Sequence, residues 1–112
     1  MKITHPLTVY RRLGAVLFEE AVRATGLTPG AMALRLRAEL ARPTLTAPTL
    51  RAWRRGNKAV PLAAFLAVCR IAGVRPATIV EKVTAQASQD ADAELLQLLK
   101  ELEAAKSLAE VL

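Results

Sequence analysis

The stretch TAPTLRAWRRGNKAVPLAAFLAVCRIAGV, residues 46–74, decides the fold of this chain. Residues 46–55 predict a short helix, because Thr46 can cap a helix and Pro48 is tolerated in a first turn. Gly56 predicts the end of that helix, followed by a turn. Pro61 then opens a strongly apolar segment that ends at Gly73. The stretch therefore predicts a short exposed helix, a turn and a buried helix.

The flanking sequence predicts three more helices. Apolar residues recur at steps of three and four after Pro6, which indicates a helix that ends at Gly26. A second helix begins at Pro29 and closes at Pro43, and a fifth begins at Pro76. The residues expected to face the core in the first, second and fifth helices are Leu7, Tyr10, Leu13, Leu17, Ala21, Met32, Leu36, Leu40, Ile79, Val80 and Val83. Those expected to be buried in the fourth helix are Leu62, Phe65, Leu66, Val68, Cys69 and Ile71.

The C-terminal part has a heptad pattern. Residues 84–90 are small and polar, and either a linker or a continuing helix fits them. Residues 91–112 place apolar residues at alternating steps of four and three, which is the spacing of a helix pair. A contact between two copies of the chain and docking on the domain itself both satisfy this spacing, and we favour dimerisation. The expected dimer residues are Leu95, Leu98, Leu102, Ala105, Ala109 and Leu112.

Composition favours an all-α protein. Hydrophobic residues make up 53% of the 112 residues and aromatic residues only 4%, with Ala and Leu dominant, which is typical of packed helices. We expect a five-helix domain over residues 6–83 and an amphipathic C-terminal helix. No apolar run approaches the ~18 residues that span a bilayer, and the N-terminus has no apolar signal-peptide core. We therefore expect a cytoplasmic protein.

Charge is distributed unevenly along the chain. Residues 1–86 hold 14 Lys and Arg against 4 acidic residues, whereas residues 87–112 hold 2 Lys against 6 acidic residues. A basic body rich in arginine favours a partner that carries phosphates, such as nucleic acid. Solubility alone is the simpler explanation of the same charge.

The helix at residues 46–55 has one apolar side and one polar side. Leu50 and Trp53 are three residues apart and mark the inner side, and the opposite side carries Pro48, Arg51, Ala52 and Arg55. Small residues let a backbone approach base edges, and arginine can bond guanine or hold phosphate. Five helices with a short arginine-bearing third one indicate a helix-turn-helix.

Three segments together resemble the Xre family of lambda-repressor-like DNA-binding domains. They are Gly26-Leu27-Thr28, Thr49-Leu50-x-x-Trp53-x-x-Gly56, and Pro61 with a helix that ends Ala72-Gly73-Val74. The resemblance covers residues 13–83. It implies a domain that places the third helix in the major groove of double-stranded DNA, usually as a dimer on inverted half-sites.

The resemblance also implies roles for individual residues. The base contacts are Thr46, Pro48, Arg51 and Ala52, to which we add Thr49 of the same helix. Arg55 falls where the family holds phosphate, and Thr28 lies at the start of the second helix, which touches the DNA backbone. We add Arg54 and Lys58 to the phosphate contacts.

The sequence departs from the family in two places. Residues 33–46 are longer than the compact turn of the family, so either the second helix is extended or its loop is enlarged. Arg35, Arg37 and Arg42 then become further phosphate contacts. The family commonly has Glu directly after the tryptophan, whereas this chain has Arg54, for which we expect Glu19 or Glu20 as the partner.

We therefore expect a sequence-specific transcription regulator, and family habit favours a repressor. The alternative is a protein-interaction module, such as an antitoxin or a phage or plasmid accessory factor, whose acidic C-terminal helix binds a partner protein. That helix could also fold onto the basic face as a mimic of DNA. One His, one Cys and no phosphate loop or H-E-x-x-H motif argue against an enzyme, a metal site and a cofactor. No segment is left for a separate sensor domain, so ligand control is not expected.

Overall fold

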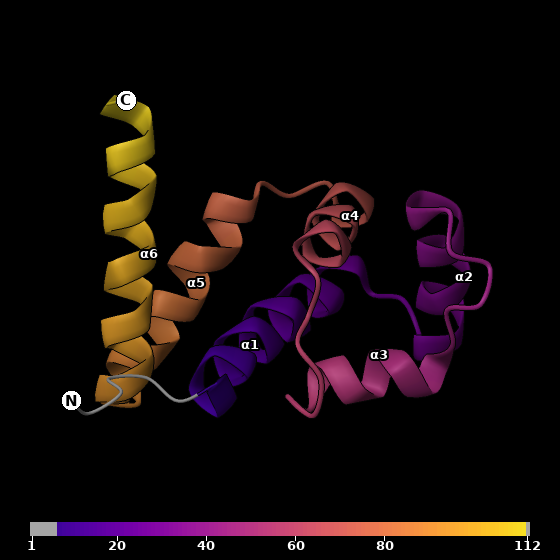
Figure 1. Cartoon of the computed structure of the whole chain (residues 1–112), viewed down its shortest axis with the longest axis horizontal. Coiled ribbons are helices and arrows are strands. Elements are labelled where there is room, and N and C mark those ends of the chain that lie inside the picture. Colours follow the sequence, from indigo (N-terminus) through magenta and orange to yellow (C-terminus); the bar gives the residue numbers. More distant parts are fainter. Residues whose placement is uncertain (1–6, 112) are drawn as a thin grey trace.

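The computed structural model describes residues 7–111, with the side chains of residues 10–104, and this part of the chain is built of α-helices without strands (Figure 1). The six helices are α1 (Leu7–Thr25), α2 (Pro29–Leu40), α3 (Ala47–Arg54), α4 (Leu62–Ala72), α5 (Pro76–Gln89) and α6 (Ala93–Val111). The expected all-α class is confirmed.

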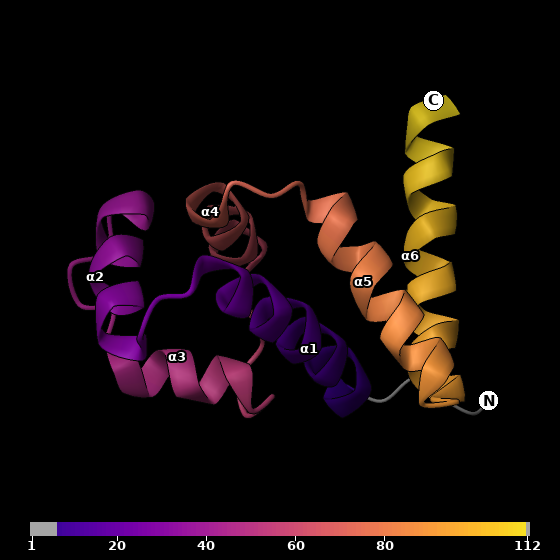
Figure 2. The same cartoon turned by 180° about the vertical axis from the view of Figure 1, so that it is seen from behind.

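Helix α1 lies at the centre of the arrangement. It packs against α3, α4, α5 and α6, and α2 packs against α3 and α4 on the far side (Figures 1 and 2). In Figure 1, α3 runs along the lower edge and the α4–α5 connection along the upper edge. Helix α3 and the α4–α5 connection therefore lie on opposite sides of the molecule.

The core is apolar throughout the described residues. Its largest fully buried side chains include Phe18, Met32, Leu36, Leu50 and Ile79, contributed by four helices, and no polar or charged residue is buried there. Burial of a large apolar side chain stabilises by about 1.5–3 kcal/mol, so this cluster is the main source of stability. The heptad-patterned C-terminal helix joins it through Leu95 and Leu99.

Two alternatives were open for residues 33–46, a longer second helix or a larger loop, and the structure has the longer helix. It runs to Leu40 and ends at Ala41, whose φ of 51° is left-handed. The helix thus stops before Pro43, because Ala41 already adopts a capping conformation in which its N–H and that of Arg42 bond to α2 carbonyls. The connection to α3 is a short loop in which Leu45 is fully buried.

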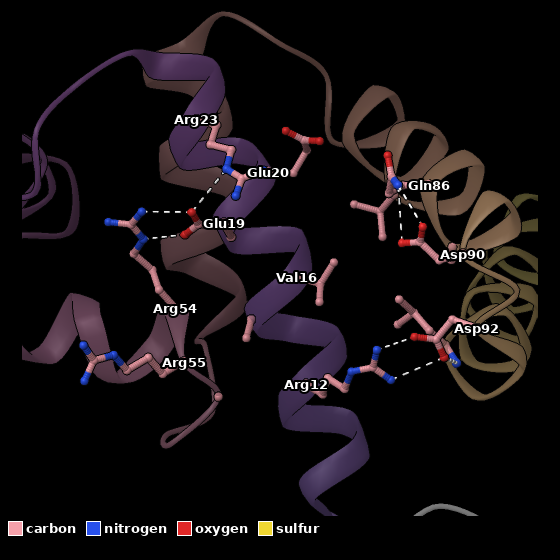
Figure 3. Close-up of a pocket in the computed structure, with 15 residues that line it drawn as sticks. Arg12, Val16, Glu19, Glu20, Arg23, Arg54, Arg55, Gln86, Asp90 and Asp92 are labelled. Atoms are coloured by element: carbon pink, nitrogen blue, oxygen red, sulfur yellow. Dashed lines mark hydrogen bonds and ion pairs between the residues drawn. The ribbon is translucent and has the colours of Figure 1, made fainter.

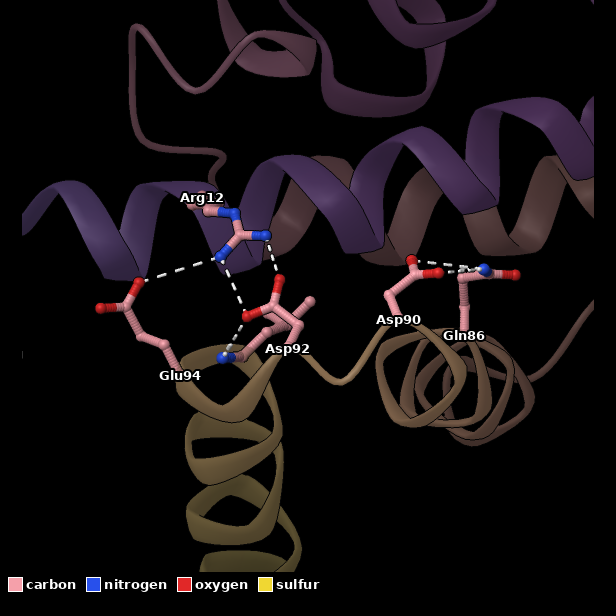
Figure 4. A network of polar contacts seen from close by, with 6 residues as sticks. Arg12, Gln86, Asp90, Asp92 and Glu94 are labelled. Atoms are coloured by element: carbon pink, nitrogen blue, oxygen red, sulfur yellow. Dashed lines mark hydrogen bonds and ion pairs between the residues drawn. The ribbon is translucent and has the colours of Figure 1, made fainter.

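Residues 84–89 continue α5, so a helix and not a linker occupies this segment. The chain turns at Ala91, whose φ is 53°, and α6 begins directly afterwards. Asp92 caps α6 by accepting a hydrogen bond of 3.2 Å from the Leu95 N–H. The same carboxylate holds Arg12 of α1 (Figure 4), so this corner is fastened to the centre of the fold.

The N-terminal half of α6 docks on its own chain. Leu95 and Leu98 are 5% and 2% exposed, so within this arrangement they are not available for a contact between copies. Helix α6 packs against α5 and α1, and a seam between copies of the chain stays a prediction. Leu102 is 40% exposed and remains accessible. Leu112 and the side chains of Ala105 and Ala109 lie outside the described residues.

Two other core expectations were wrong. Leu62 is 70% exposed, because it stands in the first turn of α4 and the buried face of that helix begins at Ala64. Tyr10 is about half exposed near the start of α1.

No single helix in the described part of the chain has the length and hydropathy needed to cross a membrane. Helices α4 and α5 reach those limits only when taken together, and they are bent by 98° relative to each other.

Candidate nucleic-acid interface

The inner side of α3 is anchored in the core. Leu50 and Trp53 are 1% and 3% exposed. The indole ring of Trp53 meets the Phe18 ring of α1 edge to face, with 5.7 Å between the ring centroids and 87° between the ring planes. Such aromatic pairs add about 0.5–1.5 kcal/mol to the effect of burial. This anchoring fixes the rotation of α3 about its axis, and therefore which residues face outward.

Both ends of α3 are defined by local backbone structure. Thr46 stands at the N-cap in an extended conformation, and its Oγ1 lies 3.3 Å from Oγ1 of Thr49. At the other end Gly56 has a φ of 77°, and the Asn57 N–H donates to the Ala52 carbonyl at 2.9 Å. A left-handed residue that closes a helix in this way is usually glycine. The helix therefore occupies the predicted range to within one residue at each end.

The outward side of α3 carries the predicted base-contact residues. Thr46, Pro48 and Arg51 are exposed, and Thr49 and Ala52 are half-buried. All five belong to one short helix and its cap. A rigid element that presents one arginine among small side chains can approach a flat, polar surface closely.

The segment of sequence that contains this helix carries only positive charges. Residues 41–80 contain seven Lys and Arg and no acidic residue. Arg54 pairs with Glu19 and Arg70 pairs with Glu39, both of which lie outside that segment. The other five, which have no ion-pair partner among the described residues, are exposed: Arg42, Arg51, Arg55, Lys58 and Arg75. Their charge is therefore available to an anionic partner.

Arg54 is engaged inside the fold. Its Nε and Nη2 donate to the two carboxylate oxygens of Glu19, the latter over 2.9 Å (Figure 3). The Arg54 hydrogen bonds lower the pKa of Glu19, and the same bonds raise the pKa of Arg54. The expected pair with Glu19 or Glu20 is confirmed for Glu19. We therefore assign Arg54 to the α1–α3 contact and no longer to a phosphate.

The predicted phosphate residues of α2 fall into two groups. Thr28 caps the end of α2 that lies beside α3, where it accepts a hydrogen bond of 3.3 Å from the Ala31 N–H (Figure 1). The arginines belong to the middle and opposite end of α2 and to the loop that follows it. Arg37 Nε donates to the Leu45 carbonyl at 2.6 Å and so holds this loop, whereas Arg35 and Arg42 are exposed.

Sequence reasoning missed the contacts that tie α6 to α1. Arg12 donates to both carboxylate oxygens of Asp92, one of them at 3.4 Å, and its Nη1 lies 3.8 Å from Glu94 (Figure 4). The Arg12 hydrogen bonds lower the pKa of Asp92. The opposite charges of the body and the tail were the only sequence signal for this contact. Because Asp92 and Glu94 of the tail meet Arg12 of α1, they neutralise one arginine of the basic body.

Cys69 contributes to packing. It is almost fully buried, and burial raises the pKa of its thiol, which keeps it protonated. Comparison of the chain with protein-family models, curated proteins and solved structures finds no match.

Proposed function

We propose that the chain is a sequence-specific, double-stranded DNA-binding transcription regulator of the repressor type, with α3 as its recognition helix. The observation that carries the proposal is the division of α3 into two sides. Leu50 and Trp53 fix the helix in the core, and the opposite side presents Arg51 in a segment that has no acidic residue. A basic helix that is anchored in the core along one side fits the major groove, which is about 12 Å wide.

Base recognition would come from the first two turns of α3. Arg51 can donate two hydrogen bonds to a guanine edge, and Pro48 and Thr46 offer small surfaces that pack against neighbouring bases. Thr49 and Ala52 are half-buried and would contribute through close approach of the helix. One bidentate arginine–guanine pair discriminates against a wrong base by about 1–3 kcal/mol.

Phosphate contacts would flank the helix on both sides. Arg55 and Lys58 follow its C-terminal end, and Thr28 stands at the start of α2 beside it. Arg35 and Arg42 form a second, more distant set, which would require DNA to extend along α2. Phosphate contacts carry little sequence information, but they fix the position of the domain on the duplex.

The test is selection of bound sequences from random duplexes, followed by affinity measurements on the selected site. We expect a defined site, and Arg51→Ala should weaken binding by about 1–3 kcal/mol while relaxing preference at one position. Arg75→Ala is the matched control, because Arg75 is an exposed, unpaired arginine at the α4–α5 connection, across the molecule from α3 (Figure 1). It should leave preference unchanged.

Three results would contradict the proposal. Selection could return no preferred sequence. Arg51→Ala and Arg75→Ala could change affinity equally at every sequence. Both variants could also bind with an affinity that does not depend on salt, which phosphate contacts do not allow.

The exposed part of α6 supports an additional role in protein contact, either with a second copy of the chain or with another protein. Leu102 is exposed between the exposed carboxylates Glu101 and Glu103. A chain shortened to residues 1–101 keeps Leu95 and Leu99 in the core and removes this surface. If α6 pairs two copies, the shortened chain should become monomeric and bind DNA more weakly with unchanged preference. If α6 binds another protein, DNA binding should stay unchanged.

A further inference from the structure

An open cavity of about 580 Å³ lies between α1 and α5, next to the C-terminal end of α3 (Figure 3). Its floor is apolar and is formed by Ala15, Val16, Val83, Ala87 and Leu95. Pockets that hold small organic ligands fall in this range of volume and combine an apolar lining with a few polar groups. None of these five floor residues takes part in the proposed contact with DNA, whereas Arg55, at the edge of the cavity, does.

Two ion pairs stand in the walls of the cavity. The Arg12–Asp92 pair joins α1 to α6, and the Arg54–Glu19 pair joins α1 to α3. Arg23 also forms an ion pair with Glu19, with 3.3 Å between its Nε and the carboxylate. Arg55 also borders the cavity, but its guanidinium points away from α1 (Figure 3). The lining arginines are therefore paired or directed elsewhere.

Two lining carboxylates remain without a cation. Glu20 of α1 has no hydrogen-bond or ion-pair partner among the described residues. Asp90, at the C-cap of α5, accepts side-chain hydrogen bonds only from the neutral amide of Gln86 among the described residues, at 3.2 and 3.3 Å. Figures 3 and 4 show Gln86 and Asp90 on the side of α5 that faces α1. Glu20 of α1 and Asp90 at the end of α5 are thus two carboxylates without an ion-pair partner beside an apolar floor.

We propose that this cavity binds a small organic cation with an apolar body, of the alkylammonium class. The ammonium group would lie between Glu20 and Asp90, and the alkyl part would cover Val16, Val83 and Ala87. An anion is less favoured, because Arg12, Arg23 and Arg54 already lie in ion pairs and the Arg55 guanidinium points away from α1. A metal ion is not expected there, because the described residues contain no group of three His, Cys, Asp or Glu side chains that could hold one.

The probes are three compounds of one shape and different charge: n-hexylammonium, n-hexanol and n-hexanoate. Each is titrated into the full-length protein while the backbone amide resonances are followed by NMR. Hexylammonium should produce saturable shifts in the cavity-lining parts of α1 and α5. Hexanol should bind more weakly, and hexanoate most weakly. Added salt should weaken binding of hexylammonium and leave that of hexanol unchanged.

Charge-removing variants locate the ammonium group. Glu20→Gln and Asp90→Asn should each weaken hexylammonium binding about two- to fivefold, as expected for one partly exposed charge pair, and leave hexanol binding unchanged. Glu81→Gln is the matched control, because Glu81 is an exposed carboxylate of α5 that does not line the cavity. It should leave both affinities unchanged.

Several outcomes would overturn the proposal. Hexylammonium shifts that rise linearly without saturation would show that there is no site. Hexanoate binding as tightly as hexylammonium would refute a cation site, and so would an equal effect of Glu81→Gln and Glu20→Gln. Circular dichroism of each variant establishes that it is folded. The experiment uses no DNA, so its outcome does not depend on the proposed regulator function.

Discussion

Arg54 of α3 and Glu19 of α1 form a two-bonded ion pair that fastens the outer helix to the central one. The two residues are 35 positions apart in the sequence, and each side chain is only about a quarter exposed. Together with the Phe18–Trp53 ring contact, the pair gives α3 a second point of attachment to α1. Helix α3 is thus held by apolar packing along its side and by charge near its end.

Removing this pair should destabilise the protein in a pH-dependent way. Because the folded-state pKa of Glu19 lies below its ordinary value of 4.5, the pair contributes stability that is fully present above that value. The contribution is lost as the pH falls through the lower, folded-state pKa. Glu19→Gln should therefore lower the free energy of unfolding by about 1 kcal/mol at pH 7, discounted for partial exposure, and by much less near pH 3. Urea unfolding followed by the fluorescence of Trp53 measures both values.

Glu20→Gln is the control for this prediction, since the neighbouring carboxylate has no partner among the described residues. Its effect should stay within about 0.5 kcal/mol at either pH. The Glu19→Gln variant should keep some acid sensitivity, because the lowered pKa of Asp92 acts in the same direction. An equal loss for both variants, or a larger loss near pH 3 than at pH 7, would show that the pair does not stabilise the fold.

The local parts of this fold could be predicted from the sequence. Caps, prolines and glycines define α3, and the three-residue step from Leu50 to Trp53 identifies its buried side. The partner of Arg54 could be predicted because the family that the sequence resembles commonly has Glu at this position. The opposite charge here indicated a carboxylate partner on the first helix, which is Glu19. The bounds and the buried side of α3 depend only on residues within one or two helical turns, and the partner of Arg54 depends only on the sign of its charge.

The arrangement of α6 could not be predicted in the same way. Its heptad spacing is satisfied equally by its own chain and by a partner, and the sequence does not distinguish them. The outcome depends on the turn at Ala91 and on the pair between Arg12 and Asp92, which are 80 residues apart. The cavity between α1 and α5 likewise exists only once these distant helices are placed together.

Two glycine substitutions should have opposite effects on stability. Gly30 stands in the first turn of α2, and a Cβ built there meets nothing within 4 Å. Gly30→Ala should raise the free energy of unfolding by about 0.5–1 kcal/mol by restricting the unfolded chain. Gly56 has a φ of 77°, so Gly56→Ala should lower it by about 1–2 kcal/mol. Differential scanning calorimetry should show a higher Tm for the first variant and a lower Tm for the second, and shifts of the same sign would contradict this.

Arg55 should contribute to DNA affinity without contributing to sequence preference. It is exposed, follows the last turn of α3 and has no carboxylate partner among the described residues. Loss of one phosphate contact reduces the slope of log affinity against log salt by about 0.9. Arg55→Ala should therefore weaken binding to selected and unrelated duplexes alike and make the slope shallower by about that amount. An unchanged slope would remove Arg55 from the phosphate contacts, and Arg75→Ala serves as the control for overall charge.

The two halves of α6 should respond differently to substitution. Leu99 is 1% exposed and belongs to the core, so Leu99→Ala should lower the free energy of unfolding by about 2–5 kcal/mol. Leu102, at 40% exposed, should tolerate Ala with a change within about 0.5 kcal/mol. Comparing substitutions at these two residues distinguishes effects on folding from effects on association, because Leu102 is accessible to a second copy and Leu99 is not.

Light scattering of the wild-type protein and of Leu102→Glu provides the association test. If the accessible half of α6 pairs two copies, the wild-type mass should be that of a dimer, and the added charge should convert it to a monomer with an unchanged unfolding curve. An intact dimer in the Leu102→Glu variant would place the contact elsewhere. Strong destabilisation by Leu102→Ala would instead mean that this residue is covered within one chain, in the way that Leu95 and Leu98 are.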